Sequence, residues 1–364
     1  MAEPVQDKKK FVPDFDIYLD GSQLTGEKKS CVIDVSVDMS LNSPDMFMVT
    51  FNNRTAQNKG MWIDSMAREW ATVRVDMGYQ GDLSTLLNGE VVGHEARFVE
   101  DGPTHYTVRG YDFLHRLTRG RYTRSWKDTP DSDIAKEIAM SVGFSVKEVA
   151  NTPPQEYVLI NNQSYLDFLR ERARRYNLEV DVDEKKNFYY REPKHKEAQV
   201  LELKWELDLV EFSPRLSTAH QVTKVIVKGW DPRTKKEIVG IAETPADTMG
   251  GSKDGTALTK KGLGAVETVI VDKPIHKQEE ADAMAKAKLL DRQLDLITGE
   301  AVCRGDYRIR AGSVVKLSAV GERYSGTYYV TNALHCFHNG GYRTTFNFRR
   351  SGIGDGSGKV QQVP

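Results

Sequence analysis

One group of side chains that could do chemistry consists of four carboxylates between residues 171 and 183. Glu171, Glu179, Asp181 and Asp183 are of the type that a glycosidase needs, since that reaction uses two facing carboxylates at a set separation. All four carboxylates are explained equally well as charged residues on the surface of the protein. The sequence contains no Gly-x-Ser-x-Gly elbow, Walker loop or Rossmann fingerprint. We therefore expect a protein that is not an enzyme and has no catalytic residues.

A second candidate is a metal site at His335, Cys336 and His338. Alternation in a strand would place His335 on one face and the other two partly elsewhere, and no CxxC or HExxH motif completes a ligand set. We expect an ordinary strand here, with no metal and no cofactor. With Cys31 and Cys303, the cysteines number only 3 in the whole chain, which argues against a disulfide framework.

The composition limits what kind of protein can position these residues. The chain has 364 residues, long enough for two to four domains at roughly 100–200 residues each. Its 51 basic and 52 acidic residues nearly cancel, which argues against a dedicated nucleic-acid or polybasic membrane binder. No apolar run approaches the roughly 20 residues that span a bilayer, and the first residues lack the apolar core of a signal peptide. We expect no membrane anchor.

Short β-rich segments bounded by Gly, Asn, Asp or Pro dominate the first third of the chain. Several alternate apolar with polar residues, as strands with one buried face do. The segments are Phe15–Leu19, Cys31–Val37, Met46–Phe51, Thr72–Met77 and Tyr106–Gly110. This pattern predicts a small antiparallel barrel or sandwich.

The middle of the chain predicts a small α+β module from about 112 to 195. One helix is expected after Thr129 as N-cap, ending at Gly143, and a second is expected where Ser164 and Asp167 form a capping-box-like pair. The arginines of the second helix should face solvent. A hairpin is expected over 178–191.

The rest of the chain returns to strands. A strand is expected at Val222–Trp230, a long loop at 243–264, a helix at about Lys277–Leu296 and further strands from Gly299 to Arg349. The segment from Ser351 to Lys359 is too rich in Gly and Ser to pack.

Two distant segments share an order of features. Val73–Gly78 and a hairpin ending at Gly110 resemble Val315–Gly321 and a hairpin ending at Arg349, each with a Gly turn and a Phe at similar places. One interpretation is that any two antiparallel sheets look alike. The other is a duplicated β-domain, so that a trimer would present six similar units around one axis.

Four segments in this order resemble the late control D family of phage tail proteins, the baseplate hub of contractile tails, which is related to the hub portion of type VI secretion spike proteins. They are Asp131–Ala139, Asn162–Glu179, Val227–Asp231 and the end of the chain from Gly299, including Arg310–Leu317, Tyr324–Val330 and His335. The resemblance covers about 110 to 350 well and the first hundred residues loosely.

The resemblance implies a β-rich α+β fold in which two tube-like antiparallel β-barrel domains flank a small α+β module. We expect a flexible tail at 1–12, a first barrel at 13–111, the module at 112–197, a second barrel with an inserted loop and helix at 198–350, and a flexible tail at 351–364.

The resemblance also implies a structural hub that joins the tail tube to the central spike through a homotrimeric, pseudo-hexameric ring. Expected partners are the tail tube protein, a separate spike protein and baseplate wedge or tape-measure proteins. DNA or an effector would pass through the lumen without specific binding. The location would be the baseplate of a virion or injection particle, assembled in the bacterial cytoplasm.

Partner contacts are expected at two loops in matching places of the repeat, 79–87 and 321–326, and on the arginine face of the second helix. The candidate residues are Tyr79, Gln80, Leu83, Leu86, Arg170, Arg174, Arg175, Glu322, Arg323 and Tyr324. For the arginines, a solvated face is the alternative to contacts with acidic groups of a neighbour.

Two other functions stay open. Gly60–Trp62 and Gly229–Trp230 place aromatic residues near turns, where they could mark a carbohydrate site of a host-surface binding tail protein or plug the end of a barrel. A cell-wall hydrolase component is the remaining alternative.

Overall fold

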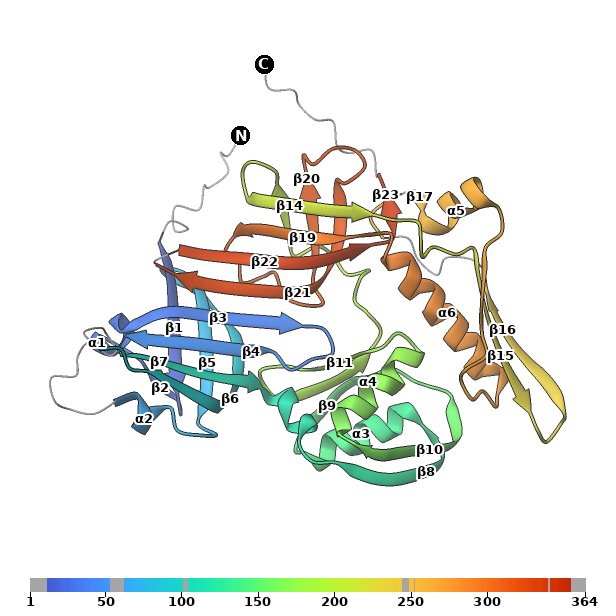
Figure 1. Ribbon diagram of the computed structural model, residues 1–364, viewed down its shortest axis with the longest axis horizontal. Coiled ribbons are helices and arrows are strands. Elements are labelled where there is room, and N and C mark those ends of the chain that lie inside the picture. The colour runs from blue at the N-terminus through green and yellow to red at the C-terminus, as the bar shows by residue number, and fades with distance from the viewer. Residues whose placement is uncertain are drawn as a thin grey trace, which may run out of the picture.

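The computed structural model describes residues 12–52, 62–100, 104–243, 249–251, 253–339 and 341–354, and predicted features at 1–11, 53–61 and 355–364 lie outside it. Strands predominate, so the predicted β-rich α+β class is confirmed (Figure 1). The strands are β1 (Pro13–Leu19), β2 (Ser22–Gln23), β3 (Val32–Ser40), β4 (Met46–Asn52), β5 (Thr72–Tyr79), β6 (Asp82–Arg97), β7 (His105–Asp112), β8 (Tyr122–Pro130), β9 (Ser145–Val149), β10 (Pro154–Gln163), β11 (Glu179–Val182), β12 (Asn187–Arg191), β13 (Leu201–Lys204), β14 (Leu209–Leu216), β15 (Lys224–Asp231), β16 (Lys236–Ala242), β17 (Lys253–Asp254), β18 (Glu267–Ile270), β19 (Ile297–Arg304), β20 (Val314–Ser318), β21 (Gly326–His338), β22 (Gly341–Arg350) and β23 (Gly352–Ile353). The helices are α1 (Glu27–Ser30), α2 (Trp62–Met66), η1 (Phe113–Thr118), α3 (Asp131–Ser141), α4 (Tyr165–Arg175), α5 (Gly255–Leu263) and α6 (Gln278–Leu294).

The largest sheet joins strands from both ends of the chain. Its order is β14-β19-β22-β21-β3-β4-β7-β6-β5-β1-β2, with β20 and β13 attached beside β21. Figure 1 shows β22, β21, β3, β4 and β7 stacked across the molecule. Within the described residues the pairings leave open edges and do not close into a ring, so the two closed barrels remain a prediction.

This sheet contains the same six-strand pairing order twice. The N-terminal unit runs β3-β4-β7-β6-β5-β1 and the C-terminal unit runs β14-β19-β22-β21-β20-β13. The last pair differs, because β1 is antiparallel to β5 whereas β13 is parallel to β20. The pairing order therefore favours the interpretation that the two similar segments of the sequence belong to a duplicated β-domain.

Irregularities in register fall at matching places of the two units. The ladder of β6 with β7 shifts between Val91 and Gly93, and that of β21 with β22 shifts between Val330 and Asn332. In the same positions, Val91 N–H donates to the Ala71 carbonyl at 3.0 Å and Val330 N–H donates to that of Ser313 at 2.9 Å. Bulges re-aim a strand in a defined way, so their repetition is strong support for two copies of one unit.

A second pair of shifts aligns the outer strands. In the N-terminal unit the ladder of β3 with β4 shifts between Val32 and Asp34, and in the C-terminal unit that of β14 with β19 shifts between Leu209 and Glu211. Position by position, β14 thus corresponds to β3.

The two units share one apolar core. Its buried side chains come from both ends of the chain and include Val35, Val37, Phe47, Ala333 and Phe346, all 0% exposed. Burial of this continuous apolar surface is the main stabilising contribution to the sheet.

The predicted α+β module has a core of its own. Helices α3 and α4 contribute Ile134, Ile138 and Leu169 to it, and Phe188 of β12 is fully buried there. The predicted hairpin is present as β11 and β12. The capping pair is also confirmed, because Ser164 Oγ accepts from the Asp167 N–H at 3.1 Å.

A small sheet, β16-β15-β18, packs against α6 as an insertion in the C-terminal unit. The predicted helix at 277–296 is α6, but the loop predicted at 243–264 is wrong in its second half. Asp254 accepts a hydrogen bond from the Ala257 N–H at 2.7 Å and caps α5 there. Residues 244–248 and 252 lie outside the described part.

Three further predictions need correction. Residues 351–354 are packed, since Ser351 is 0% exposed and β23 pairs with β17, so the C-terminal tail cannot begin at 351. The N-cap of α3 is Pro130, and the predicted Thr129 lies in β8. The predicted loop 79–87 is strand except for the turn at Gln80 and Gly81.

Candidate functional site

The first predicted contact region is the tight turn between β5 and β6. Tyr79 is half-buried, and its hydroxyl donates to the Gly305 carbonyl at 3.0 Å, which ties the two units together. Gln80 is exposed and Leu83 half-buried, but Leu86 is only 2% exposed. Leu86 is therefore a core residue of this fold and not an exposed one.

The second region is the loop between β20 and β21. Glu322 and Arg323 are exposed, and Tyr324 is half-buried, with its carbonyl accepting from the Tyr328 hydroxyl at 2.6 Å. Because β5-β6 and β20-β21 are corresponding hairpins, the two predicted loops do occupy matching places.

The three arginines of α4 lie in different surroundings. Arg174 is exposed and Arg170 half-buried, whereas Arg175 forms an ion pair with Glu280 of α6 in the same chain. The side chains of Arg175 and Glu280 are 10% and 2% exposed. The prediction that Arg175 lies in solvent is therefore wrong, because α6 from a distant part of the sequence covers it.

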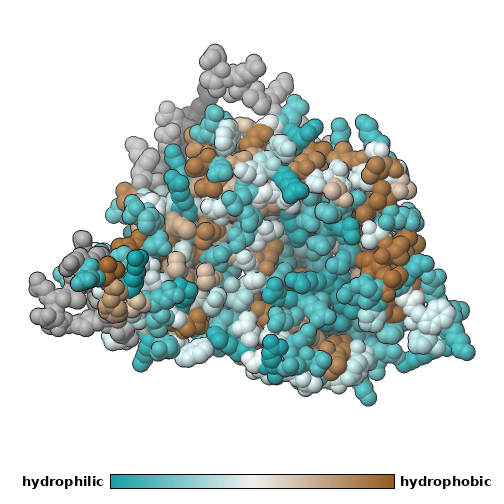
Figure 2. Space-filling view, viewed as in Figure 1, coloured by the Kyte–Doolittle hydropathy of each residue, from teal (hydrophilic) through white to brown (hydrophobic). Residues whose placement is uncertain are grey.

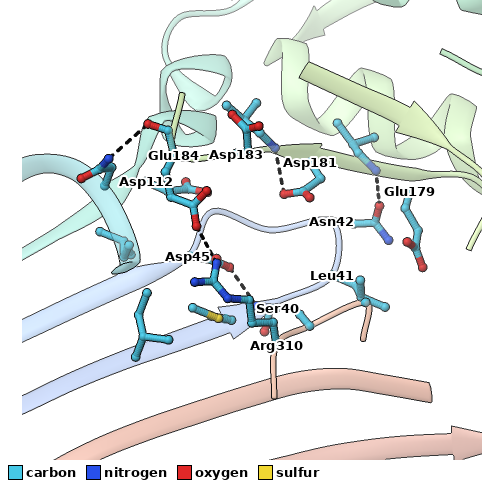
Figure 3. Close-up of a pocket in the computed structure, with 18 of the residues that line it drawn as sticks. Ser40, Leu41, Asn42, Asp45, Asp112, Glu179, Asp181, Asp183, Glu184 and Arg310 are labelled. Carbon is cyan, nitrogen blue, oxygen red and sulfur yellow. Dashed lines mark hydrogen bonds and ion pairs between the residues drawn. The ribbon is translucent and has the colours of Figure 1, made fainter. Parts of the chain in front are cut away.

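An acidic cavity of about 120 Å³ lies between the N-terminal unit and the module (Figure 3). Asp45 and Asp112 approach it from the β-sheet side, and Glu179, Asp181 and Glu184 approach it from β11 and its turn. Three of the four carboxylates singled out in the sequence, Glu179, Asp181 and Asp183, thus line one cavity. The fourth, Glu171, lies elsewhere and accepts from the Gln163 amide at 3.3 Å.

Hydrogen bonds across this cavity join the module to both β-units. Asn42 Oδ1 accepts from the Val180 N–H at 2.7 Å, and Glu184 pairs with Arg310 at 2.5 Å. Glu179 accepts from the buried Tyr329 hydroxyl at 2.7 Å. These contacts describe a structural junction, since each carboxylate named here already has a partner within the protein.

Burial raises the pKa of Asp45 well above its usual range, and the charge of Asp181 adds to this. The pKa of Asp112 is raised well above its usual range by burial and by the charges of Asp45 and Asp181. Such carboxyls bind protons more readily in the folded state than in the unfolded chain. Their contribution to stability is therefore lost as pH rises from about 4 through the raised pKa values.

Asp45→Asn is accordingly expected to raise the free energy of unfolding by about 1–2 kcal/mol at pH 8 and to change it little at pH 4. The asparagine oxygen can still accept from the Ser40 N–H, which the carboxylate does at 3.0 Å. Urea unfolding of both proteins at several pH values measures this. An equal effect of the substitution at pH 4 and pH 8 would contradict the assignment.

His335, the centre of the possible metal motif, is a core residue. It is 0% exposed, and its ring nitrogens lie 2.8 Å from the Ile309 carbonyl and 2.8 Å from the Tyr342 hydroxyl. Burial lowers the pKa of His335 to about 4. Both ring nitrogens of His335 therefore already have protein partners. Cys336 and His338 lie on the other face of β21, away from His335. Within the described ranges no three His, Cys, Asp or Glu side chains are grouped as metal ligands would be.

One face of the main sheet is mostly polar across β21, β3, β4, β7 and β6, with Met46, Met48 and Leu334 among its polar residues. In β3 the buried Val35, Val37 and Met39 alternate with polar residues on this other face. The polar side chains contact one another across strands, with Thr50 to Thr107 at 3.1 Å, Asn332 to Asp38 at 2.7 Å, Glu95 to Arg109 at 2.6 Å and Asp34 to His338 at 3.3 Å. The result is a wide, hydrogen-bonded surface of mixed charge.

An apolar surface lies on the outer face of β16-β15-β18. Trp230, Ile241 and Val269 are 55%, 47% and 50% exposed, and Figure 2 shows hydrophobic residues gathered toward the side of the molecule where β15 and β16 lie. The predicted aromatic at Gly229–Trp230 is therefore on an open sheet face. Gly60 and Met61, by contrast, belong to the undescribed segment.

A family model described as the Alg8 N-terminal domain matches residues 9–339, which include most of both β-units and the whole module. The chain belongs to this family. Comparison of the sequence with curated proteins finds no match.

Solved structures with the same fold come from phage tails and a secretion system. The 43 kDa tail protein of prophage MuSo2 from Shewanella oneidensis is 14% identical, with a TM-score of 0.69 over 93% of this chain and 98% of its own. A tail protein from Neisseria meningitidis is 13% identical, with a TM-score of 0.67 over 94% and 98%. The E. coli c3393 protein, described as a component of the type VI secretion system similar to the T4 tail proteins gp27 and gp5, is 11% identical, with a TM-score of 0.61 over 96% and 80%. This chain thus has the fold of phage tail and spike-related proteins.

None of the described helices is long and apolar enough to cross a membrane.

Proposed function

We propose that this protein is the baseplate hub of a contractile phage tail or a related injection particle, where it joins the tail tube to the central spike. The observation that carries the proposal is the six-strand unit present twice in one chain, within a fold similar over nearly its full length to tail proteins. A duplicated unit lets a three-fold assembly match six-fold neighbours, because three chains supply six similar units.

In this proposal the protein forms a homotrimeric, pseudo-hexameric ring of tube-like barrels and works by assembly, not catalysis. Its partners are the tube protein, a separate spike protein and wedge or tape-measure proteins. The tube would be met through the matching hairpin ends, where Gln80, Glu322 and Arg323 are exposed. The ring would be assembled in the bacterial cytoplasm and end in the baseplate of the particle.

The polar sheet face is a suitable lining for the lumen of such a ring. Its acidic and basic groups are paired with each other, as in Glu95 with Arg109 and Asp34 with His338. A strongly cationic lining would hold phosphate tightly, whereas a mixed lining lets DNA or an effector pass without specific binding.

Light scattering at several concentrations tests the assembly, and pull-downs with the tube and spike proteins of the same particle test the role. We expect a mass of three times 41.1 kDa and retention of both partners. The variant Glu322→Lys/Arg323→Glu should keep the trimer and lose tube binding, with the exposed pair Asp133→Lys/Lys136→Glu on α3 as its matched control. A monomer at all concentrations that binds cells but neither partner would favour a host-surface binding protein instead.

A further inference from the structure

Among the open strand edges of the described residues, those of β14 and of the end of β6 lie in the main sheet at corresponding places of its two units. β14 pairs with β19 on one side only. The end of β6 pairs with β7 on one side, while β5 accompanies β6 only as far as Glu90. Phe98, which follows β6, is 72% exposed, and Val99 is 45% exposed. Open edges present unpaired N–H and C=O groups that can bind another strand.

The chain itself contains a model for how such edges meet. Where the two units join, β3 of the N-terminal unit pairs antiparallel with the second half of β21, with Ser40 opposite Asn332 and Ser36 opposite Cys336. The Leu41 N–H donates to the Thr331 carbonyl at 3.1 Å at the end of this ladder.

Each open edge corresponds to one partner in that internal junction. The shared register shifts align Asp34 of β3 with Glu211 of β14, and Asn332 of β21 with Gly93 of β6. The open edge of β14 is thus the second copy of the β3 edge, and the open edge of β6 is the second copy of the β21 edge. Phe98 takes the place of Phe337, whose ring packs 4.7 Å from that of Phe15.

We propose that β14 of one copy of this chain pairs antiparallel with residues Gly93–Val99 of a second copy, in the register of the internal junction. Ser217, Arg215 and Ser213 of one chain then lie opposite Gly93, Glu95 and Arg97 of the other. The ladder would extend the main sheet from chain to chain through main-chain hydrogen bonds.

Side chains along the two edges are complementary in this register. Glu95, which already pairs with Arg109 in its own chain, would also face the exposed Arg215, and opposite charges facing each other across strands stabilise a pair. The exposed Phe98 meets the half-buried Phe212, which removes apolar surface of both rings from water.

Pro214 is the one position that costs a hydrogen bond. Pro214 corresponds to Val37 of β3. The Leu41 N–H points toward β21, and main-chain N–H groups alternate in direction along a strand, so the Val37 N–H also points toward β21. A proline there removes one donor opposite Ala96 and leaves the donors of Phe212 and Leu216. The proposed ladder therefore has one main-chain hydrogen bond fewer than the internal junction.

The contact is head-to-tail, because each chain contributes a different edge to each of two neighbours. Such a contact closes into a ring or grows into a filament according to the rotation between copies. The junction rests on the strand pairings alone, whereas its closure after three chains rests on the proposed hub function.

Cysteine cross-linking of the full chain tests the register, and the chain supplies its own reference. Cys336 lies opposite Ser36 in the internal junction, so Ser36→Cys places two thiols across β3 and β21. The matching pair between copies is Arg97→Cys with Ser213→Cys. Oxidation by copper–phenanthroline removes both thiol protons and two electrons to form each disulfide.

We expect Ser36→Cys to form a disulfide within one chain, and Arg97→Cys/Ser213→Cys to give covalent multimers on a non-reducing gel that dithiothreitol reverses. The off-register variant Arg97→Cys/Arg215→Cys should give at least about tenfold less product. Each single variant should give no ladder, and a mixture of the Arg97→Cys and Ser213→Cys proteins should stop at dimers.

The proposal is overturned if the matched pair stays reduced while Ser36→Cys oxidises fully, or if the off-register pair cross-links as well as the matched pair. Glu95→Cys/Arg215→Cys repeats the test in case the first pair perturbs folding. A trimer by light scattering without the cross-link refutes this junction but leaves the hub standing. Cross-linked chains that bind neither tube nor spike support the junction and refute the hub.

Discussion

Glu280→Ala is expected to lower the free energy of unfolding by about 3–5 kcal/mol, because it leaves the buried Arg175 guanidinium without its counter-charge. The Glu280 side chain is 2% exposed and also accepts from the His276 N–H at 3.3 Å, at the start of α6. Arg175 keeps only the Pro274 carbonyl, at 3.1 Å, as a described acceptor. The pair links the module to α6, so docking of the module on α6 should weaken as well.

Urea unfolding at pH 7 measures this effect, and two variants control it. Asp133→Ala breaks the exposed pair of Asp133 with Lys136, whose side chains are 54% and 38% exposed, and should cost less than about 1 kcal/mol. Arg175→Met/Glu280→Leu removes both charges and should cost less than Glu280→Ala alone. If Glu280→Ala costs no more than Asp133→Ala, the pair is not buried in solution as described.

Gly110→Ala is the second substitution with a large expected effect, a loss of at least about 3 kcal/mol. A Cβ at Gly110 of β7 would lie 2.0 Å from the Glu90 carbonyl oxygen and 2.6 Å from the Phe47 ring. Phe47 is opposite Gly110 and 0% exposed, so neither the ring nor the backbone has room to move. The C-terminal unit has the same pair with the residues exchanged, since Gly299 of β19 lies opposite Phe348 of β22.

Gly93→Ala is the matched control in the neighbouring strand. A Cβ there would meet only the Arg109 side chain, at 3.6 Å, so a change within about 1 kcal/mol is expected. Denaturant midpoints of the two variants give the comparison. Similar stabilities for Gly110→Ala and Gly93→Ala would mean that the β6-β7 ladder relaxes easily and that the packing described around Phe47 is not restrictive.

Local signals in the sequence were sufficient where neighbouring residues decide the structure. The cap of α4 was predictable because Ser164 and Asp167 are three residues apart and bond each other directly. Helix α5 has a comparable cap at Asp254, but Gly255 and Gly262 have low helix propensity and favoured a loop instead. The ribbon of β8 and β10 was missed because strand signals there are interrupted by charged and polar residues.

The roles of single charged residues depended on distant partners. Helical periodicity placed Arg175 on a polar face of α4, but only the packing of α6 against that face turned it into a buried ion pair. Glu179, Asp181 and Asp183 were visible as a group of carboxylates. Their position in a junction cavity with Asp45 and Arg310 follows from the docking of β11 on the turn after β3.

The sequence by itself determined the β-rich α+β class, the helices α3, α4 and α6, strands such as β3, β4 and β15, and the similarity between the two ends of the chain, because these depend on local alternation, caps and turns. Only the tertiary structure decided that β3 and β21, from opposite ends of the chain, pair in one sheet, and that β14 and β6 are left with corresponding open edges. The physical reason is that a strand's side chains specify which face is buried, whereas main-chain hydrogen bonds are the same for every partner. The choice of neighbour is therefore made by the packing of the whole core.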